Sequence, residues 1–379
     1  DACPANLTGK QLSPMHIVEN LKDHMVAIGH QGERDPEHVE PSPILNGLDG
    51  VISETSIWDC LNCGACMEEC PVTVEHVPTI MDMRRHLVLE ESKVPESAMN
   101  ALLSLEQRGH PWRGTQYSRT DWAEGLEVPT LAEKPDAEVL FWVGCTPALE
   151  QRSQAIARSM AKILKAAKVD FAILGDEETC TGDPARRMGN EYLFQILAQQ
   201  NIDTMNGYNV KKVVTTCPHC FNTMKNEYPQ LGGNFEVLHY SQFVDQLIKK
   251  GSIKPIKMMN ITMAYHDSCF LGRHNGIYDE PRDVAKAIPG LKLVEMGSRC
   301  RERGFCCGAG GGHMWIEESQ GTRVNHARTD QFLETEADTV GVSCPFCVQM
   351  MAEGIQAKGL ESEKQAKDVL EILADSLEL

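Results

Sequence analysis

Four cysteines in the run CLNCGACMEECP, residues 60–71, have spacings that suit iron–sulfur chemistry. The run matches the pattern C-x2-C-x2-C-x3-C-P, in which three thiolates bind one cubane cluster and the fourth usually ligates a second cluster. Zinc sites rarely use four cysteines in this arrangement, so the pattern favours iron–sulfur clusters over zinc. The chemistry that it predicts is the transfer of single electrons.

A second Cys-Pro pair, Cys3 and Pro4, has the ending of such a run without its beginning. If Cys70 serves another cluster, the three preceding cysteines need a distant fourth ligand, and Cys3 is the candidate in the leading region. We expect Cys70 to close a second cubane whose other ligands lie upstream of residue 1, so that the chain starts inside a longer motif. The first [4Fe-4S] cubane would use Cys3, Cys60, Cys63 and Cys66.

Nine further cysteines form two sets with nearly equal spacing, which indicates an internal duplication. The later set has the gaps C-x36-C-C-x36-C-x2-C and consists of Cys269, Cys306, Cys307, Cys344 and Cys347. The earlier set has the gaps C-x34-C-T-x35-C-x2-C and consists of Cys145, Cys180, Cys217 and Cys220. The remaining cysteine, Cys300, fits no ligand spacing and is predicted to be a free thiol.

The two sets differ at one position, where Thr181 in the first corresponds to Cys307 in the second. Five thiolates, including an adjacent pair, could hold an opened, non-cubane [4Fe-4S] cluster. Four thiolates would suit an ordinary cubane or an incomplete site. The first set could also be a degenerate copy that binds no metal, and the sequence leaves these possibilities open.

Polar and small residues beside the second set could assist a redox site. Gly308, Gly310 and Gly311 belong to a glycine run that lacks the lysine of a phosphate-binding loop, so we expect them to let the backbone approach a cluster and donate N–H groups to its sulfurs. The titratable neighbours could move protons or could simply form hydrogen bonds around the ligands. They are His266, Asp267 and His313.

The elements that would position these cysteines fall into three regions and a connecting segment. Residues 1–105 are predicted to be helical, and 106–136, rich in Gly, Pro and Trp, to connect them to the rest. Beyond residue 137, short apolar runs alternate with amphipathic helical segments, which predicts two mainly parallel, three-layer α/β domains at 137–250 and 251–379. The cysteines would then lie at the carboxyl ends of strands, where open α/β sheets build their sites.

Composition restricts the class of protein further. The chain has 379 residues, 15 cysteines and a net charge of −18. A disulfide scaffold would be short and secreted, whereas clustered thiols in a long chain indicate metal ligands in a reducing compartment. The negative charge argues against nucleic acid or an anionic membrane surface as the main partner. We find no apolar run of 18 residues and no signal-peptide pattern, so we expect no membrane span in this chain.

The pattern C-x(about 35)-C-C-G-x(about 35)-C-P-x-C resembles the cysteine-rich domain that occurs twice in HdrB, one of the proteins of heterodisulfide reductase. The leading helical part resembles HdrC of the same enzyme. With the motifs TCTGDP and FCCGAGGG, the whole chain resembles membrane-bound relatives that pass electrons from electron-transferring flavoprotein to menaquinone. The resemblance implies an α-helical ferredoxin-like (HdrC-like) domain followed by two CCG domains, at the cytoplasmic face of the cell membrane. It also implies haem b in a membrane domain upstream of this soluble chain.

We therefore expect an iron–sulfur electron-transfer oxidoreductase. Electrons would enter from a flavoprotein at the second cysteine set and pass through the two cubanes toward menaquinone. One alternative is reduction of a disulfide, such as a thiol-coenzyme heterodisulfide, which needs a substrate cleft beside Cys306 and Cys307. Another is the iron–sulfur component of a glycolate or lactate oxidase. A zinc-binding scaffold is the non-redox alternative, and a brown colour of the protein would exclude it.

Overall fold

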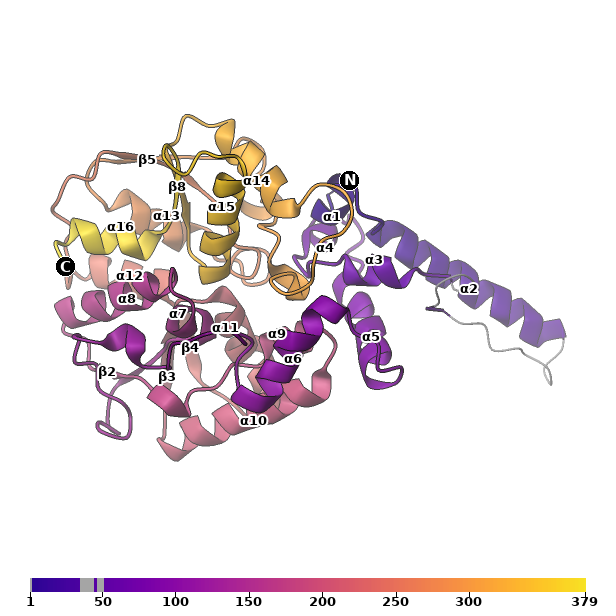
Figure 1. The fold of residues 1–379 in the computed structure, drawn as a ribbon, viewed down its shortest axis with the longest axis horizontal. Coiled ribbons are helices and arrows are strands. Elements are labelled where there is room, and N and C mark those ends of the chain that lie inside the picture. The colour runs from indigo at the N-terminus through magenta and orange to yellow at the C-terminus, as the bar shows by residue number, and fades with distance from the viewer. Residues whose placement is uncertain (1, 35–43, 46–50) are drawn as a thin grey trace.

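The computed structural model describes residues 2–34, 44–45 and 51–379 and arranges them as a helical region beside two α/β units (Figure 1). The described helices of the first region are α1 (Pro4–Leu7), α2 (Pro14–Arg34), α3 (Glu54–Trp58), α4 (Ala65–Glu68), α5 (His76–Leu89) and α6 (Glu96–Arg108). Helix α2 projects from the body of the molecule as an arm (Figure 1). Within the described ranges, no helix is both long and apolar enough to span a bilayer.

Helix α6 carries the chain across residue 105, where the sequence predicts the helical region to end. Its buried side chains follow the three- and four-residue spacing of a helix face, from Ala98 through Ala101 and Leu102 to Leu105. The helix ends at Gly109, whose φ of 69° is the left-handed conformation that glycine adopts at little cost. The connecting segment after it includes the short 3-10 turn Asp121–Ala123 and buries Trp122.

Each α/β unit contains a four-stranded parallel sheet, and the strand orders, β2-β1-β3-β4 and β6-β5-β7-β8, are equivalent. The first sheet contains β1 (Val139–Trp142), β2 (Phe171–Ala172), β3 (Lys212–Thr215) and β4 (Glu236–His239). The second contains β5 (Ile261–Tyr265), β6 (Leu291–Val294), β7 (Thr339–Val342) and β8 (Gln365–Asp368). The equivalent orders confirm the predicted parallel sheets and the internal duplication. Strands β1 and β7 are buried throughout, as expected for central strands of parallel sheets.

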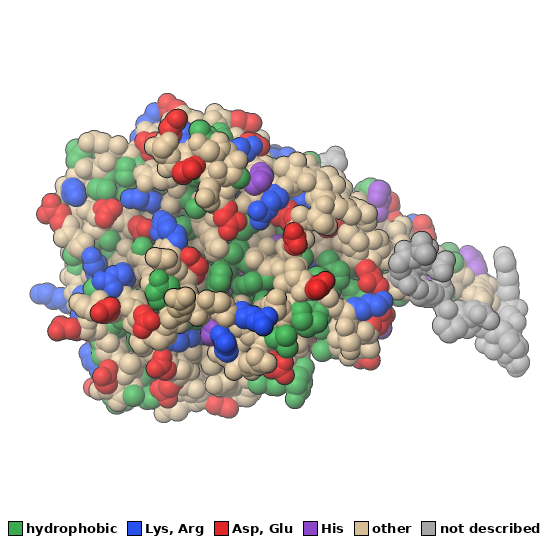
Figure 2. All heavy atoms as spheres, viewed as in Figure 1, with side chains coloured by type: hydrophobic (Ala, Val, Ile, Leu, Met, Phe, Trp, Pro, Cys, Tyr) green, Lys and Arg blue, Asp and Glu red, His purple; other side chains and the backbone are tan. Residues whose placement is uncertain are grey.

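Helices connect the strands as crossover units, as parallel pairing requires. In the first unit they are α7 (Cys145–Leu149), α8 (Gln154–Ala166), α9 (Asp183–Arg187), α10 (Glu191–Gly207), α11 (Pro218–Asn222) and α12 (Tyr240–Lys249). In the second they are α13 (Asp279–Lys286), α14 (Val324–Leu333), α15 (Pro345–Ala357) and α16 (Val369–Ser376). Helix α8 packs against α16, and α12 packs against α13. Because α8 corresponds to α13 and α12 to α16 in the duplication, each unit contributes the same two helices to the interface between the units. On the face in Figure 2, acidic and basic side chains are interspersed over these units.

The interface between the units contains a fully buried carboxyl group at the end of β8. Asp368 caps α16, and its Oδ1 lies 2.7 Å from the hydroxyl of Tyr240, which also lies 2.8 Å from Oγ of Ser343. The equivalent strand end in the first unit carries His239, which caps α12 in the same way. Burial raises the pKa of Asp368 to about 8, because removing the carboxylate from water disfavours its charged form.

We predict that Asp368→Asn makes the protein less sensitive to rising pH. The neutral carboxyl group is favoured in the folded state, so its contribution is fully present below the unfolded pKa near 4 and is lost as pH rises through about 8. Between these values the wild type should lose up to about 1.4 kcal/mol per pH unit relative to the variant. Anaerobic denaturant titrations from pH 5.5 to 8.5 would measure this.

The exposed Asp203 on α10 provides a control. Asp203→Asn should follow the wild-type pH dependence. If Asp368→Asn also followed it, Asp368 would be charged in the folded protein throughout this range.

Candidate metal centres

The second cysteine set converges at the carboxyl end of the second sheet. Cys269 follows β5, whereas Cys344 immediately precedes α15 after β7 and Cys347 lies in the first turn of that helix. Cys306 and Cys307 come from the long loop after β6, and Cys306 contacts both Cys269 and Cys307. The sulfurs of Cys307 and Cys347 lie 3.4 Å apart. All five side chains are buried, and all fifteen cysteines of the chain are free thiols.

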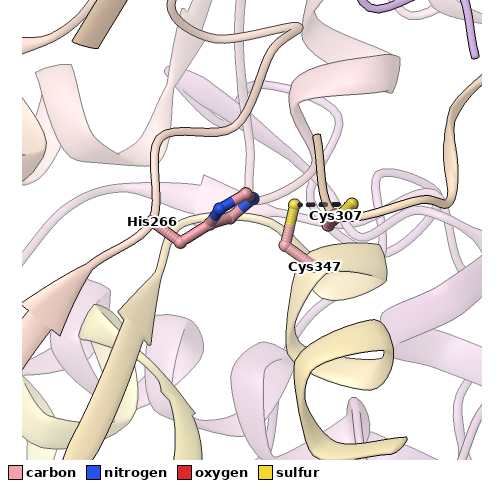
Figure 3. Close-up of side chains that lie close together, drawn as sticks. All are labelled: His266, Cys307 and Cys347. Atoms are coloured by element: carbon pink, nitrogen blue, oxygen red, sulfur yellow. Dashed lines mark hydrogen bonds between the residues drawn. The ribbon is translucent and has the colours of Figure 1, made fainter. Parts of the chain in front are cut away.

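His266 lies against this thiol group (Figure 3). A ring nitrogen of His266 and the sulfurs of Cys307 and Cys347 all lie within 4.8 Å of one another. Nδ1 of His266 accepts a hydrogen bond from Nε of the buried Arg328 at 3.0 Å, which leaves the proton of a neutral ring on Nε2. Cys306, Cys347 and His266 together hold the pKa of Cys307 well below its usual range. The site thus favours a thiolate at Cys307.

The first cysteine set lines one cavity at the carboxyl end of the first sheet. Cys145, Cys180, Cys217 and Cys220 all contribute to its wall, together with Thr181. The hydroxyl of Thr181 donates to the sulfur of Cys220 at 3.8 Å. Cys217 also contacts Cys344 of the second set, so the two sets meet where the units meet.

The leading region brings together the four cysteines expected to share a cubane. Cys3 and Cys66 each lie close enough to Cys60 and Cys63 for the thiols to interact electrostatically. Burial, reinforced by these neighbouring thiols, raises the pKa of Cys3 to about 12. Cys63 contacts Cys306 of the second set. The three sets therefore form a continuous series, with the second set in the middle.

Cys70 stands apart from these four cysteines. Its half-buried sulfur accepts a hydrogen bond from the N–H of Val74 at 3.4 Å, and this and nearby backbone N–H groups lower its pKa. It lines an open cleft together with Cys3 and Cys66. Cys70 is therefore open to the same cleft as two members of the four-cysteine group.

A buried cation holds the loop that carries Cys60 and Cys63, here called the first cysteine loop, against the α/β units. Arg84, fully buried on α5, donates hydrogen bonds to the carbonyl oxygens of Ile57, Trp58, Cys60, Arg187 and Gly311. One guanidinium group thus contacts the helical region and both units. Burial lowers the pKa of Arg84 to about 10, against the attraction of Cys60 and Asp59, and the group stays protonated at neutral pH.

Residues of the second unit donate further hydrogen bonds to carbonyl groups of that loop and of Trp58. Nε of Arg273 donates to the carbonyl oxygen of Cys63 at 2.7 Å, and Nε2 of His274 donates to that of Asn62 at 2.8 Å. Nε2 of His313 donates to Trp58 at 2.8 Å. Since the loop directs its carbonyl groups outward, its N–H groups are free to point inward, and that of Asn62 donates to the sulfur of Cys60 at 3.5 Å.

These arrangements fit anionic iron–sulfur clusters. The thiols converge without disulfides, and backbone N–H groups donate to sulfurs, as Gly308 does to Cys306 at 3.4 Å. Arg273 lies near three thiols, Cys63, Cys269 and Cys306, and would offset thiolate charge there. A bound cluster would supply the exchange of single electrons. The protein's own part is to bury the thiols and present donors to them.

Other residues singled out by sequence have structural contacts as well. Asp267 forms a bidentate ion pair with the buried Arg282 at 2.6 and 2.9 Å and also accepts from the N–H of Arg301. Burial lowers the pKa of His313 to about 3, so its ring is neutral. Gly310 and Gly311 lie against the first cysteine loop, where a Cβ would overlap carbonyl oxygens. Proton transfer by these side chains, and approach of these glycines to a cluster, stay predictions.

Sequence reasoning missed the residues that join the regions. Arg84, Arg273 and His274 occur in ordinary helical or loop contexts. Each binds the loop as an individual residue, so no repeated spacing in the sequence indicates these contacts. His219, between two cysteines, had a weak signal in its position. It forms an ion pair with Asp183 at 2.9 Å, and despite its burial this partner raises the pKa of His219 to about 9.

Comparison with known proteins agrees with the duplication. The cysteine-rich domain family CCG matches residues 139–225 and 263–352. The chain is 42% identical over 99% of its length to a probable iron-sulfur-binding oxidoreductase, FadF, of Bacillus subtilis, and 40% identical to the EtfAB:quinone oxidoreductase of Syntrophomonas wolfei, covering 58% and 56% of those proteins. It is 33% identical, over 82% of the relative's length, to HdrD of the dihydromethanophenazine:CoB–CoM heterodisulfide reductase of Methanosarcina barkeri. The chain thus spans little more than half of the first two relatives.

We predict that Gly311→Ala loosens the helical region from the α/β units. The new methyl group would overlap the carbonyl oxygen of Cys60, so the loop must move and its hydrogen bonds to Arg84 must weaken. The expected loss of unfolding free energy is about 2–4 kcal/mol. Denaturant titration and limited proteolysis of the anaerobic protein would measure it.

Gly276→Ala is the matched control, because Gly276 has a similar positive φ of 71° but nothing lies near its Cβ position. This variant should show only backbone strain of about 1 kcal/mol. Equal losses in the two variants would mean that the contact with the cysteine loop contributes nothing.

Proposed function

The chain belongs to the family of iron–sulfur oxidoreductases with two cysteine-rich CCG domains, which includes HdrD of heterodisulfide reductase, and we propose that it conducts single electrons between a flavoprotein and a quinone. The observation that carries this proposal is the continuous series of thiols. Contacts between Cys63 and Cys306, and between Cys217 and Cys344, join the three cysteine sets. Closely spaced redox centres suit conduction, since each exchange needs little rearrangement.

We assign the cysteine sets to different clusters. The leading region would be an α-helical ferredoxin-like domain, with one [4Fe-4S] cubane at Cys3, Cys60, Cys63 and Cys66. Cys70, which lines an open cleft, would ligate a second cubane together with upstream residues. The five thiols of the second set would hold a non-cubane [4Fe-4S] cluster, with the adjacent pair as its distinguishing feature. The four thiols of the first set would hold a further cluster, because they line one cavity despite Thr181.

The names of two relatives support the proposed partners and location. The name EtfAB:quinone oxidoreductase supports electron-transferring flavoprotein as donor and a quinone, which we take to be menaquinone, as acceptor. A relative named a probable membrane-anchored ferredoxin, 37% identical to this chain, supports a place at the membrane, which we take to be its cytoplasmic face. Haem b in an upstream membrane domain would complete the route to the quinone.

A second candidate function is reduction of a heterodisulfide. Two observations favour it: the relative from heterodisulfide reductase, and the depressed pKa of Cys307 beside its paired cysteine. It differs from the first candidate in its acceptor, which would be a small disulfide at the second cysteine set.

We predict that Cys307→Ser removes one distinct EPR signal. Anaerobically purified wild type should contain iron and acid-labile sulfide for two to three clusters per chain, and the variant should lose one of them. Cys300→Ser is the control, because Cys300 lies outside the three sets and its thiol donates only to the carbonyl oxygen of Gly297. Iron for a single cubane in the wild type would contradict a redox role for the α/β units.

Direction of electron flow is a separate prediction. Reduced electron-transferring flavoprotein should bleach the visible absorbance of the anaerobic protein in a stopped-flow experiment, and a thiol-coenzyme heterodisulfide should not restore it. If the flavoprotein failed and the heterodisulfide reoxidised chemically reduced protein, the second candidate would replace the first.

A further inference from the structure

An open cleft lies outside the first cysteine set, where α6, the connecting segment and the loop after α7 meet. Its volume of about 600 Å³ is in the range of small-ligand sites. Three aromatic side chains, Trp112, Tyr117 and Trp315, contribute to its lining, and all three are half-buried. The rings of Trp112 and Trp315 meet edge to face, with centroids 6.0 Å apart. Such walls bind flat aromatic groups well.

Two lining residues of the cleft, Trp112 and Trp315, also contact residues that line the cavity of the first cysteine set. Nε1 of Trp112 donates to the hydroxyl of Thr146 at 3.3 Å, and Thr146 follows Cys145. The ring of Trp315 packs edge-on against Phe346, with centroids 5.9 Å apart. Thr146 and Phe346 both line the cysteine cavity. One layer of side chains therefore separates the cleft from these thiols.

The aromatic contacts continue between the cysteine sets. Phe346, between Cys344 and Cys347, meets the ring of His219 edge-on at 5.2 Å. His219 occupies the equivalent position between Cys217 and Cys220, and it stacks on Phe270 at 4.1 Å. The middle residues of the two C-P-x-C motifs thus touch each other. Packed rings couple electronically better than a water-filled gap, so the cleft is connected to both α/β sites.

The lining indicates which kind of molecule fits. Apart from Arg113 and Glu150, which are opposite in charge, the lining side chains are neutral. The cleft therefore has no excess of charge that would attract a highly charged ligand. A neutral heterocycle, by contrast, could stack on the aromatic walls and form hydrogen bonds with amide and hydroxyl side chains. A molecule that uses the connection to the thiols must also exchange electrons. These conditions together describe a flat, neutral redox ring.

We propose that this cleft binds the isoalloxazine ring of the flavoprotein donor, so that electrons enter at the first cysteine set. The inference rests on the proposed function, in which the quinone lies beyond the leading region at the other end of the thiol series. It changes the point of entry from the second set, which lies in the middle of the series. A flavin hydroquinone would release two protons to solvent and two electrons, each of which reduces one ferric ion to ferrous.

Binding of free riboflavin to the anaerobic, cluster-loaded protein tests the proposal without electron transfer. Equilibrium dialysis should give an affinity for the wild type that falls at least tenfold in Trp315→Leu and in Trp112→Leu. Tyr192→Leu is the control, because Tyr192 on α10 is 70% exposed and lies outside the cleft. It should bind riboflavin as the wild type does. Equal affinity in all four proteins would overturn the proposal.

Gln116→Trp provides a test that leaves the aromatic walls intact. Gln116 is an exposed lining residue, and a bulky ring there should fill the cleft and abolish riboflavin binding without loss of iron. Menadione is tested in parallel. If Gln116→Trp abolished the binding of menadione but left the binding of riboflavin unchanged, the cleft would be a quinone site and the assignment would be overturned.

The failure of the two proposals can be told apart. Riboflavin binding that depends on Trp112 and Trp315 supports the cleft assignment whether or not electron-transferring flavoprotein reduces the protein. Absence of that reduction contradicts the proposed function alone.

Discussion

The binding of one short loop by hydrogen-bond donors from neighbouring elements fixes the relation between the three cysteine sets. The loop that contains Cys60 and Cys63 has its carbonyl groups bound from outside by Arg84, Arg273 and His274. Carbonyl groups buried without donors would cost free energy comparable to lost hydrogen bonds, so these donors stabilise the loop in this place. The same contacts leave the N–H groups directed toward sulfur. The hydrogen bonds to the carbonyl groups thus determine both where the loop lies and which of its backbone groups face the sulfurs.

The two α/β units meet through equivalent elements with different residues. At the strand ends that face each other, His239 caps one helix and Asp368 the other. Thr181 and Cys307 are the corresponding difference at the cysteine sites. A duplicated fold has been kept while the side chains diverged, so the two sites share geometry and differ in donor number.

Much of the fold could be predicted from the sequence because local pattern determines it. The alternation of apolar runs and helices predicted two parallel sheets, and the equal cysteine gaps predicted the duplication. The grouping of the two cysteine sets in the α/β units was predicted from the rule that parallel sheets collect residues at their carboxyl ends, whereas that of the leading set was predicted from the spacing of its motif. The contacts between sets could not be predicted, because Cys63 and Cys306 are far apart in sequence and nothing local indicates their proximity. The role of Gly311 in packing was likewise hidden, since glycine suits a cluster and a neighbouring backbone equally well.

Arg84 also has a consequence for how the protein is made. Its acceptors include the carbonyl groups of Arg187 and Gly311, which belong to segments translated long after the first cysteine loop. Chains generally fold from the amino terminus during synthesis. Here the hydrogen bonds of Arg84 cannot all form until the chain has been made past Gly311, about halfway through the second unit. The contacts through which Arg84 joins the leading loop to both α/β units are thus among the last that the growing chain can complete.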